Sequence, residues 1–206
     1  MDSAIQLVVG LGNPGADYVL TRHNAGFWFA DALARSQGAG FSHERKFSGE
    51  VCRLRLGEHD LRLLKPTTYM NRSGQSVQAL ASYLKLPAAA ILVAHDDLDL
   101  PLGAVRLKRG GGHGGHNGLR DIGAHLGEDF YRLRFGIGRP QRGEVIDYVL
   151  QPAGANEQSR IMEAVAATIE AMPALLAGRT EAVMNALHSR GVVPRNRREA
   201  GTKAEE

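Results

Sequence analysis

Short apolar stretches alternate with polar ones along the chain, and their spacing predicts its secondary structure. Residues 4–10 (AIQLVVG) are rich in β-branched side chains, which is typical of a buried strand, and the GNPG that follows indicates a turn. In residues 131–137 apolar side chains alternate with Arg132 and Arg134, which predicts a strand with one buried face and one basic face. The other predicted strands are residues 51–56, 61–65, 91–94 and 104–108.

Apolar residues that recur three and four positions apart predict the helices. Within residues 73–84 they fall on one face of a helix, and Ser73 is a candidate N-cap. Residues 156–172 carry a similar stripe, and Pro173 is expected to end that helix. The other predicted helices are residues 26–36, 119–126, 144–150 and 180–189.

The alternation of strands and helices predicts an α/β fold. We expect a single three-layer domain in which a twisted mixed β-sheet is flanked by helices. The sheet is expected to be mixed because residues 51–56 and 61–65 flank Gly57 and read as a hairpin. We assign residues 1–193 to this domain and expect residues 194–206, which lack apolar side chains, to be a disordered polar tail.

The composition favours a soluble globular protein. Hydrophobic residues make up 43% of the chain, and no apolar run approaches the ~18 residues of a membrane span. The N-terminus does not resemble a secretory signal, and Cys52, the only cysteine, cannot form an internal disulfide and is expected to be an inert thiol. We therefore expect a cytoplasmic protein that does not enter a membrane.

The charge is small in total but unevenly distributed. The net charge is +3, yet residues 101–142 hold eight Lys and Arg against three Asp and Glu, a balance of +5, and the rest of the chain sums to −2. Such a basic segment is suited to binding a polyanion. A solvated charged surface explains the charge equally well when the charge is taken alone.

A glycine-rich loop lies inside the basic segment. Residues 109–118 (RGGGHGGHNG) hold six glycines and no apolar side chain, which predicts a shaped loop where the backbone comes close to a partner. A flexible linker is the alternative, but linkers usually carry serine and join separate domains. The loop lacks the G-K-[ST] ending of a phosphate-cradling loop, so nucleotide hydrolysis is not supported.

Four polar segments each follow a predicted strand, and α/β sheets place their sites at the C-terminal ends of strands. The segments are GNPG to RHN, PTTYMN, HDDLD and the glycine-rich loop. Antiparallel strands would direct some of them to the opposite edge. If the segments meet, one cleft is shared by Asn13, His23, Asn71, Asp96 and Asn117.

His23 is the candidate general base, because it lies in a polar loop and an acidic cluster could supply the carboxylate that orients it. The cluster consists of Asp96, Asp97 and Asp99. A surface or capping role is the commoner fate of a single histidine. Amides that could hold a carbonyl and its developing oxyanion are Asn13, Asn71 and Asn117. No serine nucleophile motif and no reactive cysteine is evident, so acyl hydrolysis by histidine-activated water is the simplest reaction.

Two other kinds of site are disfavoured. Gly10, Gly12 and Gly15 match the dinucleotide fingerprint G-x-G-x-x-G, but the residues after them do not open an apolar helix. The histidines available for a metal are His23, His95, His113 and His116. The glycines beside His113 and His116 would hold these two imidazoles poorly, and no Cys or Glu completes a zinc pattern, so we expect no metal.

Four long motifs occur in order along the chain: VGLGNPGADYVLTRHNAGFWFAD, LLKPTTYMNRSGQSV, ILVAHDDLDLPLGAVRLKRGGGHGGHNGLRDI and RLRFGIGRP. Together they resemble bacterial peptidyl-tRNA hydrolase, and with the helices after them they cover nearly all of residues 5–190. Tyr69 stands where Phe is also used. The residues from Pro194 onward lie outside the resemblance.

The resemblance implies hydrolysis of the ester that joins a peptide, or an N-blocked amino acid, to the 3′-terminal ribose of tRNA, in ribosome rescue during translation. It implies that His23 is the base and that Asp96 keeps it in its proton-accepting form, whereas strand alternation alone leaves Asp96 and Asp97 open. Asn13 would distinguish blocked from free aminoacyl groups, and Asn71 would act in catalysis as well as in binding.

The resemblance also implies which residues contact the substrate. Positions expected to contact the peptide or the terminal nucleotide are Tyr18, Tyr69, Met70, Asn71, His116 and Asn117. Lys108 and Arg134 match basic residues associated with tRNA phosphates. The implied partner is peptidyl-tRNA, recognised at its acceptor stem and 3′ end by a monomer without cofactor.

Two hypotheses from other classes remain. An RNA-binding module that has lost catalysis would use the basic residues and the glycine-rich loop, but the presence of His23 and Asp96 argues against it. A metal- or serine-dependent esterase for small molecules would not need the +5 segment.

Overall fold

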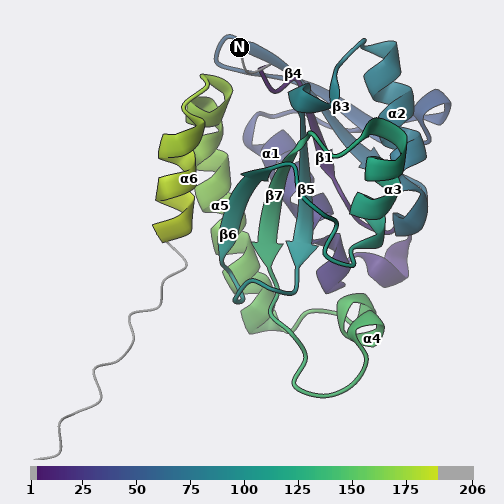
Figure 1. The fold of residues 1–206 in the computed structure, drawn as a ribbon, viewed down its shortest axis with the longest axis vertical. Coiled ribbons are helices and arrows are strands. Elements are labelled where there is room, and N and C mark those ends of the chain that lie inside the picture. The colour runs from purple at the N-terminus through teal and green to yellow at the C-terminus, as the bar shows by residue number, and fades with distance from the viewer. Residues whose placement is uncertain (1–3, 190–206) are drawn as a thin grey trace, which may run out of the picture.

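A seven-stranded mixed sheet forms the centre of residues 4–189, the part of the chain that the computed structural model describes (Figure 1). The strand order is β2-β3-β4-β1-β5-β7-β6. The strands are β1 Leu7–Gly10, β2 Ser42–Glu44, β3 Gly49–Leu56, β4 His59–Pro66, β5 Ile91–Asp97, β6 Val105–Arg109 and β7 Tyr131–Gly136.

The four central strands are parallel, and the strands at both edges are antiparallel. β1 pairs in parallel with β4 and β5, and β5 pairs in parallel with β7. β3 and β4 form the predicted hairpin, in which Gly57 adopts φ +61, a backbone conformation that favours glycine. The C-terminal ends of β4, β1, β5 and β7 therefore meet at one edge of the sheet.

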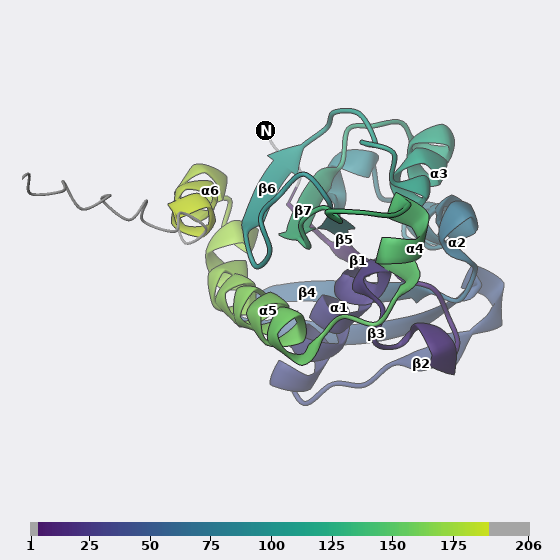
Figure 2. The same ribbon diagram turned by 90° about the horizontal axis from the view of Figure 1, so that it is seen from below.

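Helices cover both faces of the sheet, which confirms the three-layer prediction. The helices are α1 Ala25–Ser36, α2 Ser73–Tyr83, α3 Asn117–Leu126, α4 Val145–Leu150, α5 Ala155–Leu176 and α6 Thr180–Ser189. Short 3₁₀ turns are η1 Ala16–Tyr18, η2 Arg22–Asn24, η3 Arg45–Phe47, η4 Met70–Arg72 and η5 Ala88–Ala90. α1, α5 and α6 lie on one face and α2 and α3 on the other, while α4 lies beyond the C-terminal ends of β5 and β7 (Figures 1 and 2).

Each face of the sheet has its own apolar core, because successive side chains of a strand point to opposite faces. On β5, Leu92 packs with the α1 and α5 side, and Val93 packs with the α2 and α3 side. A close approach sets the position of α1: a Cβ at Gly10 would lie 2.4 Å from the carbonyl oxygen of Gly26. The absence of a side chain at Gly10 thus lets α1 pack closely against the end of β1.

One predicted helix cap and one predicted helix end are wrong. α2 begins at Ser73, but its N-cap is Arg72, and the Ser73 hydroxyl donates to the Met70 carbonyl instead of capping the helix. α5 continues past Pro173 to Leu176. Proline inside a helix costs about 3 kcal/mol. Burial of Leu175 and Leu176 after it contributes about 1.5–3 kcal/mol each, which is enough to keep the last turn helical.

In the basic segment, the structure decides a point that the sequence left open and corrects one expectation about β7. β6 is antiparallel to β7, so the glycine-rich loop leaves the sheet at the edge opposite the other polar segments and crosses back before α3. The expected basic face of β7 is not a solvent-exposed face, because Arg132 is only 3% exposed. It lies under the loop, where its Nη1 donates to the Gly112 carbonyl.

The predicted tail at residues 194–206 and the domain end at residues 190–193 lie outside the described residues. Among residues 4–189, no helix combines the length and apolar character needed to cross a membrane.

Candidate active site

One cleft of about 600 Å³ opens at the edge where the parallel strands end. The cleft is lined by all five residues that would share one if the polar segments meet: Asn13, His23, Asn71, Asp96 and Asn117. So do Tyr69, Met70, Lys108, His116 and Arg134. Tyr18 is not among its lining residues, but its ring lies edge-on to that of Tyr69, with 6.4 Å between the ring centroids.

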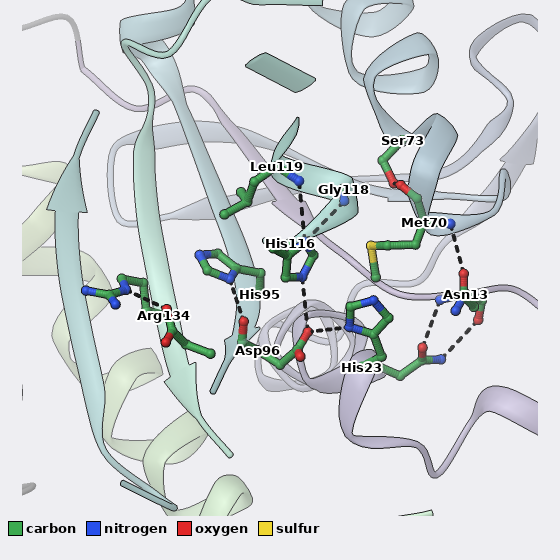
Figure 3. A network of polar contacts seen from close by, with 12 residues as sticks. Asn13, His23, Met70, Ser73, His95, Asp96, His116, Gly118, Leu119 and Arg134 are labelled. Carbon is green, nitrogen blue, oxygen red and sulfur yellow. Dashed lines mark hydrogen bonds and ion pairs between the residues drawn. The ribbon is translucent and has the colours of Figure 1, made fainter. Parts of the chain in front are cut away.

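His23 and Asp96 are in direct contact at the base of the cleft (Figure 3). His23 lies in η2, immediately before α1, and Asp96 lies near the end of β5. The distance between His23 Nδ1 and Asp96 Oδ1 is 2.9 Å. Asp97, the other acid that the sequence left open, points elsewhere and pairs with Arg134 at 2.7 Å. The contact predicted for Asp96 is therefore present.

A second histidine binds the same carboxylate oxygen. His116 Nε2 lies 3.1 Å from Asp96 Oδ1, and His116 Nδ1 accepts hydrogen bonds from the backbone N–H groups of Gly118 and Leu119 at the start of α3 (Figure 3). Because Nδ1 is the acceptor, Nε2 carries the proton and donates to Asp96. The rings of His23 and His116 lie 4.8 Å apart between centroids.

These contacts shift the charges of the pair. Burial by itself raises the pKa of Asp96, but the charge of His23 and the N–H groups of His116 and His23 hold that pKa well below the usual carboxyl range. Burial opposes the charged form of His23, but the Asp96 carboxylate outweighs this and raises the pKa of the imidazole. Asp96 is thus a carboxylate that holds Nδ1–H of His23, and Nε2 is left as the proton acceptor.

His95 is a neutral histidine below the site. Its Nδ1 donates to the backbone carbonyl of Asp96 at 2.6 Å, and its ring lies edge-on to His116, 5.0 Å away. Burial and the neighbouring His116 lower its pKa to about 3. The sequence offered His95 only as a metal ligand, but the structure places it as a support for the strand end that carries Asp96.

The Asn13 side chain is oriented by the backbone. The Met70 N–H donates to Asn13 Oδ1 at 2.8 Å, and Asn24 brackets the Asn13 backbone with two further hydrogen bonds, at 2.8 and 3.0 Å (Figure 3). This bond orients the amide and leaves the Nδ2 donors of Asn13 available to a ligand in the cleft. Met70 lies close to Gly118, where a Cβ would come within 2.6 Å of the Met70 sulfur, so α3 approaches η4 closely.

The other two amides are exposed. Asn71 lies in η4, and Asn117 is the first residue of α3. Asn117 Oδ1 accepts from Arg120 Nη1 at 3.1 Å, which directs its Nδ2 away from the arginine. Both side chains can therefore donate to a ligand in the cleft.

Sequence reasoning missed two features around the cleft. Arg22, next to His23, donates to both carboxylate oxygens of Glu157 and to the Tyr148 carbonyl, so it ties η2 to α4 and α5. Apolar side chains of α4 line one wall of the cleft: Val145, Ile146, Val149 and Leu150. Nothing in the sequence indicates that Arg22 is buried. The apolar content of residues 145–150 is visible in the sequence, but the sequence alone does not show that these residues line a cleft.

One group of residues has the geometry to bind a metal. Among residues 4–189, His23, Asp96 and His116 bring ligand atoms within 4.8 Å of one another. His113, which the sequence grouped with them, is not part of this set. The nitrogens that face Asp96 are engaged in hydrogen bonds to it, so a metal would have to displace both N–H protons.

Comparison with known proteins gives consistent matches. The family model of peptidyl-tRNA hydrolases matches residues 7–195. The peptidyl-tRNA hydrolase of Neisseria meningitidis serogroup A is 53% identical over 192 residues, which cover 92% of this chain and 100% of that protein. That of Neisseria gonorrhoeae is 52% identical over the same shares of both chains. The crystal structure of peptidyl-tRNA hydrolase from Acinetobacter baumannii is 49% identical, with a TM-score of 0.87 over 90% of this chain and 95% of that chain.

Proposed function

The chain belongs to the peptidyl-tRNA hydrolase family and hydrolyses the ester bond of peptidyl-tRNA, and we propose that a water molecule activated by His23 performs the attack. One observation carries this proposal. Asp96 Oδ1 accepts from the ring of His23, so Nε2 is the nitrogen free to take a proton at the cleft.

The proposed reaction runs in two steps. His23 Nε2 takes a proton as the water oxygen bonds to the ester carbonyl carbon, and the carbonyl oxygen becomes an oxyanion. The imidazolium is stabilised by Asp96, which stays ionised. When the carbon–oxygen bond to the ribose breaks, the imidazolium returns the proton to the ribose oxygen. The products are tRNA with a free 3′ end and a peptide with a free carboxylate.

The amides around His23 supply hydrogen-bond donors for this chemistry. We assign stabilisation of the oxyanion to Asn71, with Asn117 as a second donor, because both amides line the cleft and can donate. We assign to Asn13 the discrimination of N-blocked from free aminoacyl groups. Its Nδ2 donors suit the carbonyl oxygen of a peptide bond and are poorly suited to a free ammonium group.

The remaining positions are proposed to bind the substrate. Tyr18 and Tyr69 offer aromatic faces beside the cleft for the terminal nucleotide, and Met70 and His116 lie at its floor. Lys108 and Arg134 are proposed to bind phosphates of the acceptor stem. Arg134 already pairs with Asp97, so Lys108 is the more available cation of the two.

We further propose that the enzyme works as a monomer in the cytoplasm, in the rescue of ribosomes. The substrate is a product of translation, and Cys52 is a buried free thiol, which suits a reducing compartment. Light scattering on the purified protein tests the oligomeric state. A dimer at micromolar concentration would contradict the monomer.

The direct test follows acyl release from N-blocked aminoacyl-tRNA, with and without a chelator, by wild type and His23→Ala. We expect turnover that survives chelation and disappears in the variant. Tight tRNA binding without turnover by the wild type would favour a binding module. Chelator-sensitive cleavage of small esters would favour a metal-dependent esterase.

A further inference from the structure

Arg132 on β7 is a buried cation with two hydrogen-bond donors that have no partner. It is 3% exposed, and its Nε and Nη2 atoms have no hydrogen-bond partner among the described residues. Within residues 4–189, its guanidinium makes one hydrogen bond, from Nη1 to the Gly112 carbonyl. Burial, with a smaller effect of Arg134, lowers its pKa, and Glu128 opposes the shift. A charge of this kind is costly to bury without a partner.

The unpartnered atoms form the edge of the guanidinium that binds oxyanions elsewhere in this protein. Arg22 presents Nε and Nη2 to both carboxylate oxygens of Glu157, and Arg53 presents the same edge to Asp60. This two-point geometry fits a carboxylate or a phosphate. In Arg132 neither atom of this edge has a hydrogen-bond partner in the described part of the chain.

Arg132 lines the substrate cleft and has a second cation beside it. Lys108 pairs with Arg132 across β6 and β7, so both side chains are on the same face of the sheet, and both line the cleft. The Lys108 ammonium also lies under the glycine-rich loop, 2.5 Å from where a Cβ of Gly111 would be. The Arg132 guanidinium stacks over the Phe130 ring, 4.7 Å from its centroid, which holds its plane in place.

We propose that Arg132 is a phosphate-binding residue for the tRNA substrate, and that its Nε and Nη2 edge receives two oxygens of one backbone phosphate beneath the glycine-rich loop. The proposal rests on the proposed function, because peptidyl-tRNA is the polyanion that enters this cleft. The peptide carboxylate is esterified in the substrate, so phosphate is the oxyanion that every substrate molecule carries. A phosphate oxygen is also a stronger hydrogen-bond acceptor than the Gly112 carbonyl. The phosphate can therefore bind Arg132 beside this carbonyl or replace it.

The experiment compares two substrates in Arg132→Met, with Arg53→Met as the matched control. Arg53 lies on β3, at the far side of the sheet from β7, and carries the same charge. One substrate is N-acetyl-aminoacyl-tRNA, and the other is the N-acetyl-aminoacyl ester of adenosine, which has no phosphate. Steady-state kinetics are measured over a range of salt concentrations.

For Arg132→Met we expect KM for the tRNA substrate to rise on the order of tenfold, kcat to stay within about twofold, and cleavage of the adenosine ester to be unchanged. The slope of log(kcat/KM) against log[salt] should become shallower by about 0.7–0.9, the change expected for one phosphate contact. Arg132→Lys should keep most of the salt slope but recover KM only in part, because lysine lacks the two-point edge. Arg53→Met should match the wild type.

Thermal unfolding separates binding from folding. If Arg132 binds a ligand, its buried charge is unpaired in the free protein and does not stabilise the fold. The Tm of Arg132→Met should then equal or exceed that of the wild type. Equal losses on both substrates together with a lower Tm would show that Arg132 only supports the loop, and the proposal would be wrong. Unchanged KM and salt slope for the tRNA substrate would also overturn it. If the wild type cleaves neither substrate, the failure lies with the proposed function instead.

Discussion

The two ends of the cleft differ in how their polar groups are satisfied. At the His23 end, Asp96 Oδ1 accepts from two imidazoles, and His116 uses both of its ring nitrogens. At the other end, under the glycine-rich loop, Arg132 keeps two donors without a partner in residues 4–189. The first end, around Asp96, is hydrogen-bonded without substrate, whereas the second is proposed to bind an oxyanion of the substrate. Changes at the first end should therefore lower kcat, and changes at the second should raise KM.

The largest effect is expected from His23→Ala. Removal of the proposed base should lower kcat by about 10⁴-fold or more, because water attack then proceeds without an acceptor for its proton. The affinity for uncleaved tRNA should remain, since the proposed phosphate contacts lie at the other end of the cleft. Single-turnover kinetics and a filter-binding assay measure the two quantities. His59→Ala, which removes a histidine from β4, is the control, and turnover by His23→Ala within tenfold of that control would contradict the assignment.

Asp96→Asn should have the next largest effect, on the order of 10² to 10⁴ in kcat. The variant keeps an oxygen near His23 Nδ1 but loses the charge that stabilises the imidazolium. Asp97→Asn is the matched control, because it removes the same charge one residue away, where the partner is Arg134. Its effect should fall mainly on KM. A full kcat for Asp96→Asn would remove the carboxylate from the mechanism.

The same variant makes a prediction about pH. The base must be neutral, so the rate falls as the pH drops through the pKa of His23. The Asp96 carboxylate raises this pKa, and its removal must lower it. The acid limb of the kcat profile should therefore move to lower pH in Asp96→Asn, while the plateau falls.

The fold was predictable because the helices and the outer strands show one apolar face, while β1 and β5, which are covered on both faces, are short and largely apolar. The errors occur where tertiary contacts outweigh local preference. Pro173 lies inside α5, because the buried side chains that follow it hold the last turn in place. Ser73 lies at the correct helix end, but its hydroxyl bonds to Met70 and does not cap the helix.

The site was predictable in its residue types and only partly in its contacts. Alternation along β5 could not choose between Asp96 and Asp97, since the choice depends on where η2 places His23. The alternation in residues 131–137 predicted Arg132 as one of two arginines on a basic face opposite the buried face. Its burial follows from the path of the glycine-rich loop, which crosses back over β7, and nothing in the local sequence specifies that path.

Asn13→Asp should be less severe than Asp96→Asn, with kcat/KM for N-blocked aminoacyl-tRNA about 10²-fold lower. Aspartate still accepts from the Met70 N–H but has no donors to offer to the cleft. Discrimination against free aminoacyl-tRNA should narrow, because a carboxylate favours a free ammonium group. Rates on both substrates test this, and an unchanged ratio between them would show that Asn13 only holds η4 in place.

Lys108→Ala tests the second end of the cleft. Lys108 is exposed and lies opposite Arg132, so its loss should raise KM for the tRNA substrate several-fold and leave kcat unchanged. The salt dependence of kcat/KM should weaken by the contribution of one phosphate. Lys46→Ala in η3 removes the same charge and should change neither quantity. A fall in kcat without a change in KM would contradict the assignment of Lys108 to phosphate binding.

The smallest effect is expected from Arg120→Ala, which tests to which end of the cleft Arg120 belongs. Arg120 Nη1 donates to Asn117 Oδ1 at 3.1 Å, and this bond keeps the Asn117 donors directed away from the arginine. An exposed contact of this kind is worth about 0.5–1 kcal/mol, so kcat/KM should fall about two- to fivefold. If Arg120 acts through Asn117, the loss should disappear when Asn117 is already alanine, because the two changes then remove one interaction. If Arg120 instead binds a phosphate, the loss should persist in that background and weaken as salt rises. The double-mutant cycle, measured at two salt concentrations, therefore decides whether Arg120 supports the Asn117 amide or binds a phosphate.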